Sequence, residues 1–255
     1  MENVAMTSKF KQRFFDLIIF VFYPAGIIKV WTLKRNLWLR LVYTILGLPL
    51  FLLVFSFLGV VVVGSFLPSL DMSIGNRTDR TLFNSNGNYS VTFVKSGLET
   101  GGSYELVEVE LEPNGGNDWH YHKTFDEQFK VLEGVVTIGL ENEVYQLNPG
   151  DSVTAFRNQI HFFRNTTDKK AKLLVKTNPA RGLEKTIRVG YGLANDGQFD
   201  DNGLTRNLWH MVLLMGYSES YFDGIPAFIQ EPVVNNLARI AQWKGEDKEL
   251  FKYFK

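Results

Sequence analysis

The sequence predicts a mainly β fold, in which a jelly-roll barrel is preceded by one or two transmembrane helices and followed by a short helical tail. Three observations support this prediction. A stretch of 27 residues near the N-terminus carries no charge, short runs of alternating apolar and polar residues fill the middle of the chain, and helical periodicity returns at its end. We therefore divide the chain into a membrane anchor and linker (residues 1–73), a β-barrel (residues 74–178) and a helical region (residues 179–255).

The predicted anchor is the uncharged stretch at residues 41–67. About 20 apolar residues in a helix cross the hydrocarbon core of a bilayer, so this run is long enough to span it. The rival interpretations are a buried core helix and a cleaved signal peptide, but the run is much longer than the apolar region of about 7 to 15 residues in a signal peptide. A second apolar run, residues 14–30, is interrupted by Pro24 and Gly26. It is a first span, a re-entrant segment or an interfacial helix.

Charge is unevenly distributed along the chain, although 27 basic residues balance 27 acidic ones. Residues 1–67 carry a net charge of +5, so the rest carries −5. The connector at residues 29–40 holds four basic residues, whereas the 20 residues after Leu67 hold two. By the positive-inside rule we expect a protein of the bacterial inner membrane, with the lipid bilayer as a partner and the barrel on the extracytoplasmic side. The neutral total argues against a nucleic-acid partner.

The predicted barrel follows a linker rich in glycine, asparagine and serine at residues 73–88. In residues 104–112, Val107, Val109 and Leu111 alternate with glutamates, which is typical of a half-buried strand. Further short runs lie at residues 127–132, 135–140, 144–147, 152–156, 160–164 and 171–176. Strands of this length at this spacing predict an antiparallel sandwich or jelly-roll barrel. Helical signals follow at residues 203–217 and 226–243.

Three of the four histidines fall into one pattern with a glutamate. His120 and His122 are separated by one residue, so on a strand both imidazoles point to the same side. Glu127 opens a strand whose same-face neighbours are apolar, and an ionised carboxylate there needs a partner such as a cation. His161 lies in phase with Phe163 and Asn165 on a later strand, so it can face inward as well. Each residue alone has an ordinary structural interpretation, but together they form a nitrogen and oxygen ligand set that suits Mn, Fe, Ni, Cu or Zn.

The chain has no cysteine, so sulfur ligands are excluded and any metal must be held by nitrogen and oxygen. Residues 115–134, GGNDWHYHKTFDEQFKVLEG, resemble the first motif of the cupin superfamily, and residues 150–165, GDSVTAFRNQIHFFRN, resemble the second. The positions that carry this resemblance are His120, His122, Glu127, Gly134, Gly150, His161 and Asn165. The resemblance covers about residues 88–178. It implies a jelly-roll barrel, one metal ion bound by the three histidines and the glutamate, and pairing into a homodimer.

Two positions depart from the family pattern, and both lie in turns. Asn114 stands where the first motif has glycine, and Phe156-Arg157-Asn158 replaces the usual Pro-x-Gly turn of the second motif. Asparagine still tolerates the left-handed backbone that such a turn requires. These departures therefore leave the expected metal ligands intact.

The resemblance leaves the reaction open, and two functions compete. The first is a metal-dependent enzyme that acts on a small molecule, with dioxygenase-like chemistry favoured. The pattern shows no free general base, which leaves redox chemistry or elimination from a carboxylate substrate, in which the metal does more of the activation. We expect its pocket to be lined by Phe129, Val131, Phe156 and Phe163. The second is a non-catalytic module that binds a metal and a ligand, or a protein partner, at the membrane.

Overall fold

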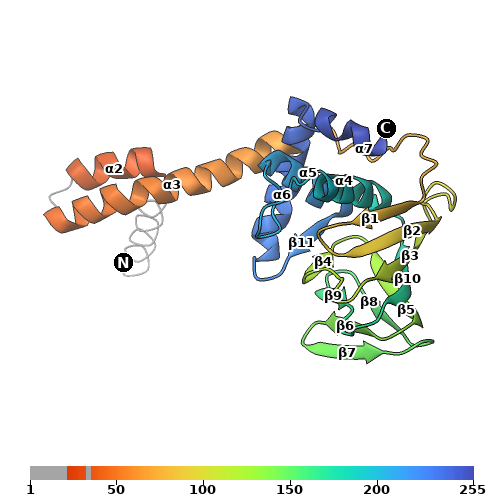
Figure 1. Cartoon of the computed structure of the whole chain (residues 1–255). Helices are drawn as coiled ribbons and strands as arrows, with labels where there is room; N and C mark the ends of the chain where they lie inside the picture. The colour runs from red at the N-terminus through yellow and green to blue at the C-terminus, as the bar shows by residue number, and fades with distance from the viewer. Residues whose placement is uncertain (1–21, 33–35) are drawn as a thin grey trace, which may run out of the picture. The chain divides into compact units, whose positions relative to one another are not determined.

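The computed structural model describes residues 22–32 and 36–255, and its contacts divide the chain into two compact units, residues 1–62 and 63–255. The first unit contains α2 (Tyr23–Thr32) and most of α3 (Leu37–Ser65). The other described helices and the described strands belong to the second unit (Figure 1). The predicted apolar run at residues 14–30 lies partly outside the described residues, and its later part forms α2.

The helix α3 is 29 residues long and contains Pro49 in its interior. It carries few charges, and none of its most apolar 18-residue window is buried. The helix is therefore long and apolar enough to cross a membrane, although a soluble core helix or a signal sequence can have the same length and composition. The helix begins four residues before the predicted span of residues 41–67.

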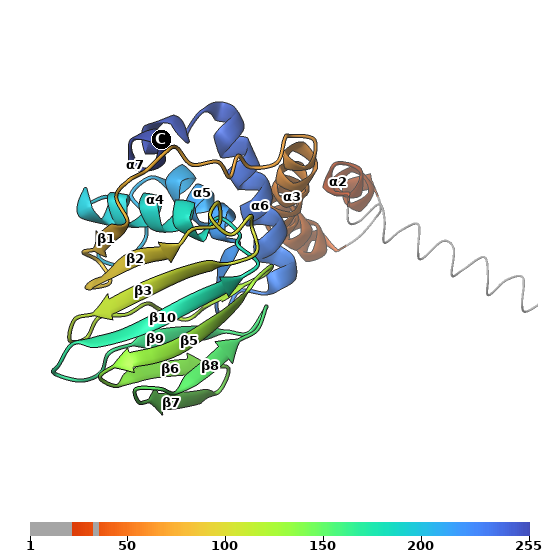
Figure 2. The same ribbon diagram turned by 90° about the vertical axis from the view of Figure 1, so that its right-hand side faces the viewer.

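Two antiparallel sheets form the barrel (Figures 1 and 2). The six-stranded sheet has the order β1-β2-β3-β10-β5-β8, and the five-stranded sheet has the order β11-β4-β9-β6-β7. The strands are β1 (Thr81–Asn84), β2 (Tyr89–Lys95), β3 (Glu105–Leu111), β4 (His120–His122), β5 (Asp126–Glu133), β6 (Val136–Leu140), β7 (Glu143–Leu147), β8 (Ser152–Ala155), β9 (His161–Arg164), β10 (Ala171–Asn178) and β11 (Ser220–Phe222). The predicted mainly β, jelly-roll class is confirmed.

The barrel core forms where the alternating residues meet between the sheets. Buried and partly exposed residues alternate along β3, as its sequence predicts. Leu111, Phe129, Val131, Ile138 and Leu173 are fully buried in this core. Because each apolar side chain of this size stabilises the fold by about 1.5–3 kcal/mol when buried, the alternation largely determines the register of the strands.

Three elements differ from the sequence prediction. The stretch at residues 73–88 contains β1, which pairs with β2, and so it is not only a linker. The helical region contributes β11, which pairs with β4 at the edge of the five-stranded sheet. The helix α4 (Leu183–Asn195) lies in a stretch where no helical signal was identified. These elements are short or carry charges and glycines, so their local patterns are weak.

The helices α5 (Leu208–Ser218), α6 (Ala227–Lys244) and α7 (Phe251–Phe254), with a 3-10 turn η1 (Lys248–Leu250), form a layer together with α4. In both views this layer lies at the end of the barrel opposite β7 (Figures 1 and 2). Ile187 and Tyr191, four residues apart on α4, belong to the barrel core. Val189 and Leu193 belong to a second core with α5, α6 and α7. The helix α4 thus separates the barrel core from the helical layer.

The predicted structural glycines occupy turns that need them. Gly134 has φ = 71° and Gly150 has φ = 97°, conformations that side chains rarely adopt. A Cβ on Gly134 would lie 2.8 Å from the carbonyl oxygen of Lys170. At the two departures from the family pattern, Asn114 and Asn158 have φ values of 64° and 65°. Both asparagines therefore adopt the left-handed conformation, which the sequence predicts for Asn158.

Asn165 joins the loop after β9 to the end of β3. Its side chain is fully buried, and Nδ2 donates hydrogen bonds to the carbonyl oxygens of Leu111, Glu112 and Lys169 at 3.3, 3.1 and 2.7 Å. Its Oδ1 accepts hydrogen bonds from the backbone and the hydroxyl of Thr167. A buried amide with these partners fixes the loop after β9, so Asn165 has a structural role.

Candidate metal centre

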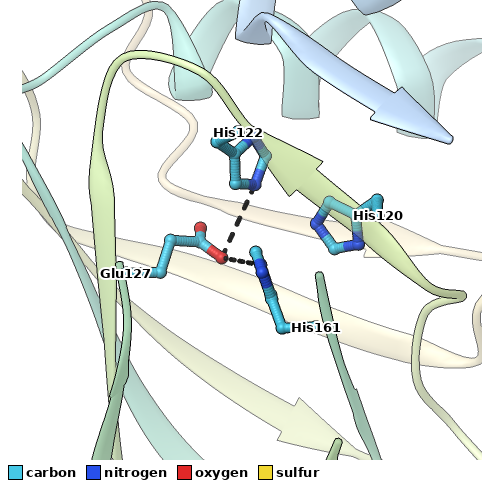
Figure 3. Close-up of side chains that lie close together, drawn as sticks. All are labelled: His120, His122, Glu127 and His161. Atoms are coloured by element: carbon cyan, nitrogen blue, oxygen red, sulfur yellow. Dashed lines mark hydrogen bonds and ion pairs between the residues drawn. The ribbon is translucent and has the colours of Figure 1, made fainter. Parts of the chain in front are cut away.

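Four side chains from both sheets meet inside the barrel. His120 and His122 lie on β4, Glu127 lies near the start of β5 and His161 begins β9 (Figure 3). Strands β4 and β9 are neighbours, with His120 opposite His161 in the register. One ligand atom from each of the four residues lies within 4.8 Å of the others. The structure thus brings together all four residues that the spacing of the sequence selects.

The imidazoles and the carboxylate point at a common centre (Figure 3). The Glu127 Oε2 atom lies 3.0 Å from Nε2 of His161 and 3.6 Å from Nε2 of His122. His122, Glu127 and His161 are buried, and His120 is partly buried. The Nε2 atom of His122 is buried without a hydrogen-bond partner. An unpaired buried nitrogen is costly, and a bound cation would satisfy it.

The outer nitrogens of the three rings are held by neighbouring groups. Nδ1 of His120 lies 2.8 Å from the carbonyl oxygen of Asp118, and Nδ1 of His161 lies 2.9 Å from that of Gln159. A ring that donates from Nδ1 to a carbonyl presents the lone pair of Nε2 to the centre. Such outer contacts orient metal-binding histidines, so the rings are arranged as ligands.

The third outer contact comes from the C-terminal region. Nδ1 of His122 lies 2.9 Å from Oγ of Ser220 on β11, and this hydroxyl lies 2.7 Å from Oγ of Ser218. Sequence reasoning missed Ser220 because β11 has three residues, too few for a recognisable alternation. Its pairing with β4 places the hydroxyl behind the ring.

The electrostatics of the cluster favour cation binding. Burial holds the pKa of His120 well below its usual value, and the neighbouring His161 and His122 lower it further. Burial alone would raise the pKa of Glu127, but the neighbouring His122 and His161 outweigh this effect and hold the pKa well below its usual value. A neutral imidazole and an ionised carboxylate are the protonation states that bind metal ions.

A cavity of about 270 Å³ opens onto the cluster, and His120, His122 and Glu127 are among its lining residues. Of the predicted pocket residues, Phe163 lines this cavity. Phe129 and Val131 are instead fully buried in the core and are not lining residues. They pack between the sheets, on the same strand as Glu127 but farther from the cavity.

The placement of Phe156 in the pocket is corrected by the structure. Its side chain is 59% exposed and does not line the cavity. Strand β8 ends at Ala155, and Phe156 begins the following turn, where its carbonyl accepts a hydrogen bond from the backbone of Gln159. The alternation of β8 therefore no longer determines the direction of this side chain.

The far side of the cavity is formed by residues that the sequence did not indicate. Tyr89 of β2 and Tyr191 of α4 line it, with Asn84 and Thr186 nearby. Burial raises the pKa of Tyr89 and, together with the neighbouring phenol, raises that of Tyr191 well above its usual value. Both phenols are therefore protonated hydrogen-bond donors. The recurrence of Leu183, Ile187 and Tyr191 at helical spacing is the signal by which α4 could have been identified.

Comparisons with known proteins agree with this architecture. Residues 107–176 match the family described as Cupin domain. An uncharacterized protein of Aquifex aeolicus (strain VF5) is 34% identical over 70 residues, a match that spans 28% of this chain and 57% of that protein.

Solved structures are similar to part of this chain. A predicted oxalate decarboxylase from Thermotoga maritima is 14% identical with a TM-score of 0.38, over 42% of this chain and 98% of the other. A sugar phosphate isomerase of a cupin superfamily from Silicibacter pomeroyi is 27% identical with a TM-score of 0.34, over 45% of this chain and 77% of the other. The activities in these names belong to those two proteins. TM-scores of this size do not indicate the reaction of this chain.

Proposed function

Because residues 107–176 match the Cupin domain family, we propose that His120, His122, Glu127 and His161 hold one divalent transition metal ion, Mn, Fe, Ni, Cu or Zn. We propose further that the chain is a dioxygenase-like oxidoreductase that acts on a small molecule in the adjoining cavity. The observation that carries this proposal is that the four ligand atoms converge beside a cavity that three of the four residues line.

The ligand set fits such an ion. The orphaned Nε2 of His122, the outward contacts of the Nδ1 atoms and the ionised Glu127 are all consistent with bound metal. When bound, a metal at this site supplies positions for substrate and water or dioxygen, with Lewis-acid or redox activation.

The residues of the cavity itself bind and orient the substrate. Apolar side chains such as Val107, Val109 and Val175 form part of its wall and exclude water. The phenols of Tyr89 and Tyr191 are donors for a polar atom of the substrate. No lysine or arginine is among the described lining residues, so an anionic substrate group would have to bind at the metal.

The proton-transfer groups of the cavity favour redox chemistry. Among the described lining residues, the titratable ones are metal ligands or protonated tyrosines. Hydrolysis or isomerisation needs a positioned general base, which these residues do not supply. The volume of about 270 Å³ lies at the small end of ligand cavities, about 300–1,000 Å³, so the substrate is small.

We also propose that α3 anchors the chain in the bacterial inner membrane, with the cupin domain on the extracytoplasmic side. The length of α3, its low charge and the excess of basic residues before residue 41 support this placement. The lipid bilayer is then a partner of the chain. Pairing into a homodimer, which the family resemblance implies, is tested by light scattering of the detergent-solubilised protein.

Elemental analysis of the full chain, purified in non-ionic detergent after expression in metal-supplemented medium, tests the metal centre. We expect about one transition-metal ion per chain, and a loss of it in His122→Ala and Glu127→Gln. His210→Ala is the matched control, because this buried histidine lies in the helical layer. Less than about 0.2 ion per wild-type chain would contradict the site.

The catalytic part of the proposal has its own test. The iron(II)-loaded chain is exposed without oxygen to nitric oxide, a dioxygen analogue, and examined by electron paramagnetic resonance. An iron–nitrosyl signal that is absent in the apo-protein supports an open position for dioxygen. A loaded protein that gives no such signal argues against dioxygenase chemistry.

A structural role for the metal is the second candidate function. His120, His122 and His161 belong to the five-stranded sheet, whereas Glu127 belongs to the six-stranded sheet. A metal held by all four residues therefore links the two sheets. In this alternative the chain is a non-catalytic metal- or ligand-binding module at the membrane, and chelation changes its stability without removing any turnover.

A further inference from the structure

A second cavity lies where the chain leaves α3 and enters the cupin unit. It has a volume of about 420 Å³. Its walls come from the segment after α3, from the loop before α4, from α5 and from α6, and the residues used below are Ser69, Met72, Arg181, Gly182, Glu219 and Arg239. All of them belong to the unit of residues 63–255.

The wall after α3 is fixed by hydrogen bonds and close packing. The backbone nitrogen of Asp71 donates to Oε1 of Gln242 at 2.7 Å, and Nζ of Lys185 donates to the carbonyl of Asp71 at 2.5 Å. A Cβ on Gly182 would collide with Met72 and with the carbonyl of Tyr217. The segment is therefore held against α4 and α6, and the cavity is preformed.

The cavity carries an excess of positive charge. Arg181 and Arg239 line it, and neither forms an ion pair with a described residue. The acidic residue among the lining side chains is Glu219, whose carboxylate accepts a hydrogen bond from Thr124. Planar guanidinium groups bind phosphate oxygens in pairs, so two of them in one cavity favour a phosphate-containing anion.

The distance along the chain places this cavity near the proposed membrane surface. The apolar run ends at Leu67, and Ser69 follows two residues later, within about 7 Å of it along the chain. The hydrocarbon core is about 30 Å thick and the whole bilayer about 40–45 Å, which leaves about 5–8 Å for each headgroup layer. This step rests on the membrane placement of α3 proposed above and is independent of the metal.

From the charge and the position of the cavity, we propose that it binds the headgroup of an anionic phospholipid, with Arg181 and Arg239 on the phosphodiester. A diacyl lipid in the layer next to α3 presents its phosphate at this depth, whereas a free phosphate ion is not held there. Headgroup binding thus supplements the anchor and fixes the cupin domain against the bilayer surface.

Titration of the full chain in non-ionic detergent with the soluble lipid dihexanoyl-phosphatidylglycerol, followed by calorimetry, tests this proposal. We expect saturable binding that weakens by about tenfold or more in Arg181→Gln and in Arg239→Gln. Arg206→Gln is the matched control, because Arg206 is an exposed arginine outside the cavity. Retained metal content and circular dichroism show that each variant is folded.

Two further titrants distinguish the sources of the phosphate group. Dihexanoyl-phosphatidylcholine is expected to bind more weakly, because its headgroup is neutral overall, and inorganic phosphate more weakly still. Inorganic phosphate that binds as tightly as dihexanoyl-phosphatidylglycerol would overturn the proposal. So would binding of this lipid that both arginine variants retain. Failure of the anchor itself shows separately, as release of the chain from membranes in a carbonate wash.

Discussion

Ser220 shows how one hydroxyl from the C-terminal region bears on the metal centre. Its Oγ lies 2.9 Å from Nδ1 of His122 and orients the ring. Contacts of this kind typically change metal affinity by about 10–100-fold, so we expect Ser220→Ala to weaken binding by that factor. Competition with a chromophoric chelator measures it. Ser152→Ala, on the exposed start of β8, should bind metal like the wild type. Equal affinity of the two variants would contradict the role of Ser220.

Glu105 predicts a pH dependence of stability. The residue is 3% exposed, its Oε2 has no hydrogen-bond partner, and burial raises its pKa from 4.5 to about 7. The folded state thus binds the proton more tightly than the unfolded state does. The resulting penalty is absent below pH 4.5, grows as the pH rises and reaches about 3 kcal/mol above pH 7.

Glu105→Gln removes this ionisation and should therefore be more stable, relative to wild type, at pH 8 than at pH 4.5. Thermal unfolding in detergent at both values measures the difference. Glu108→Gln serves as the control, because Glu108 lies on the same strand but pairs with Lys172 near the surface. A difference between Glu105→Gln and wild type that stays constant with pH would refute the prediction.

At the scale of single residues, the sequence correctly predicts those side chains whose direction follows from their spacing along a strand. His120, His122 and Glu127 lie on short strands whose alternation determines where their side chains point, and the structure brings them together. Phe156 lies one residue beyond its strand, where alternation no longer applies. Tyr191 was missed because it comes from another element, and only the packing of that element against the barrel brings it to the cavity.

Among the elements, α3 allows the most direct test, which is its retention in membranes. Arginine at the centre of a membrane-spanning helix costs about 2.5–3.5 kcal/mol on insertion scales. We expect the double variant Leu52→Arg, Leu53→Arg, at the middle of α3, to lose retention in membranes. Carbonate washing followed by immunoblotting of pellet and supernatant measures the retained fraction.

The control for α3 is a pair of arginines on the exposed β7, Val144→Arg with Tyr145→Arg, which should leave the protein in the membrane pellet. Wild-type protein in the carbonate supernatant would show that α3 does not span the membrane. Equal retention of the α3 double variant and the wild type would argue that the helix is held by protein contacts.

The predicted and missed elements differ in length and local contrast. The strands over residues 105–111 and 171–178 are seven and eight residues long and alternate clearly, and their boundaries lie close to the predicted ones. Strands β1 and β11 have four and three residues, so no window of sequence distinguishes them from turns. The helix α4 has two buried faces, and its charged Lys185 and Arg188 are buried too, which obscures the apolar stripe.

For the whole molecule, the proposed metal link between the two sheets predicts how metal removal affects stability. A ligand at a thousandfold excess over its Kd stabilises the folded state by about 4.1 kcal/mol. For a domain of this size that is about 8–16 °C in Tm. We expect dialysis against a chelator to lower Tm by an amount of this order, measured by differential scanning calorimetry.

The same scan on His161→Ala is the control, because this variant has lost one ligand and should show little further change on chelation. A wild-type Tm that does not respond to the chelator would contradict a metal bound between the sheets. If the chelated chain keeps its native circular dichroism spectrum, the metal adds stability to a fold that forms without it. Loss of that spectrum would favour the structural role.

The hydrogen bond between His122 and Ser220 spans 98 positions of the chain. His122 has therefore left the ribosome long before the hydroxyl that orients it has been made, and β11 pairs with β4 only after α5 has been synthesised. In the nascent barrel, the ring of His122 therefore still lacks its contact with Ser220. A metal bound at the proposed site would therefore reach its full affinity only after the last quarter of the polypeptide has been synthesised.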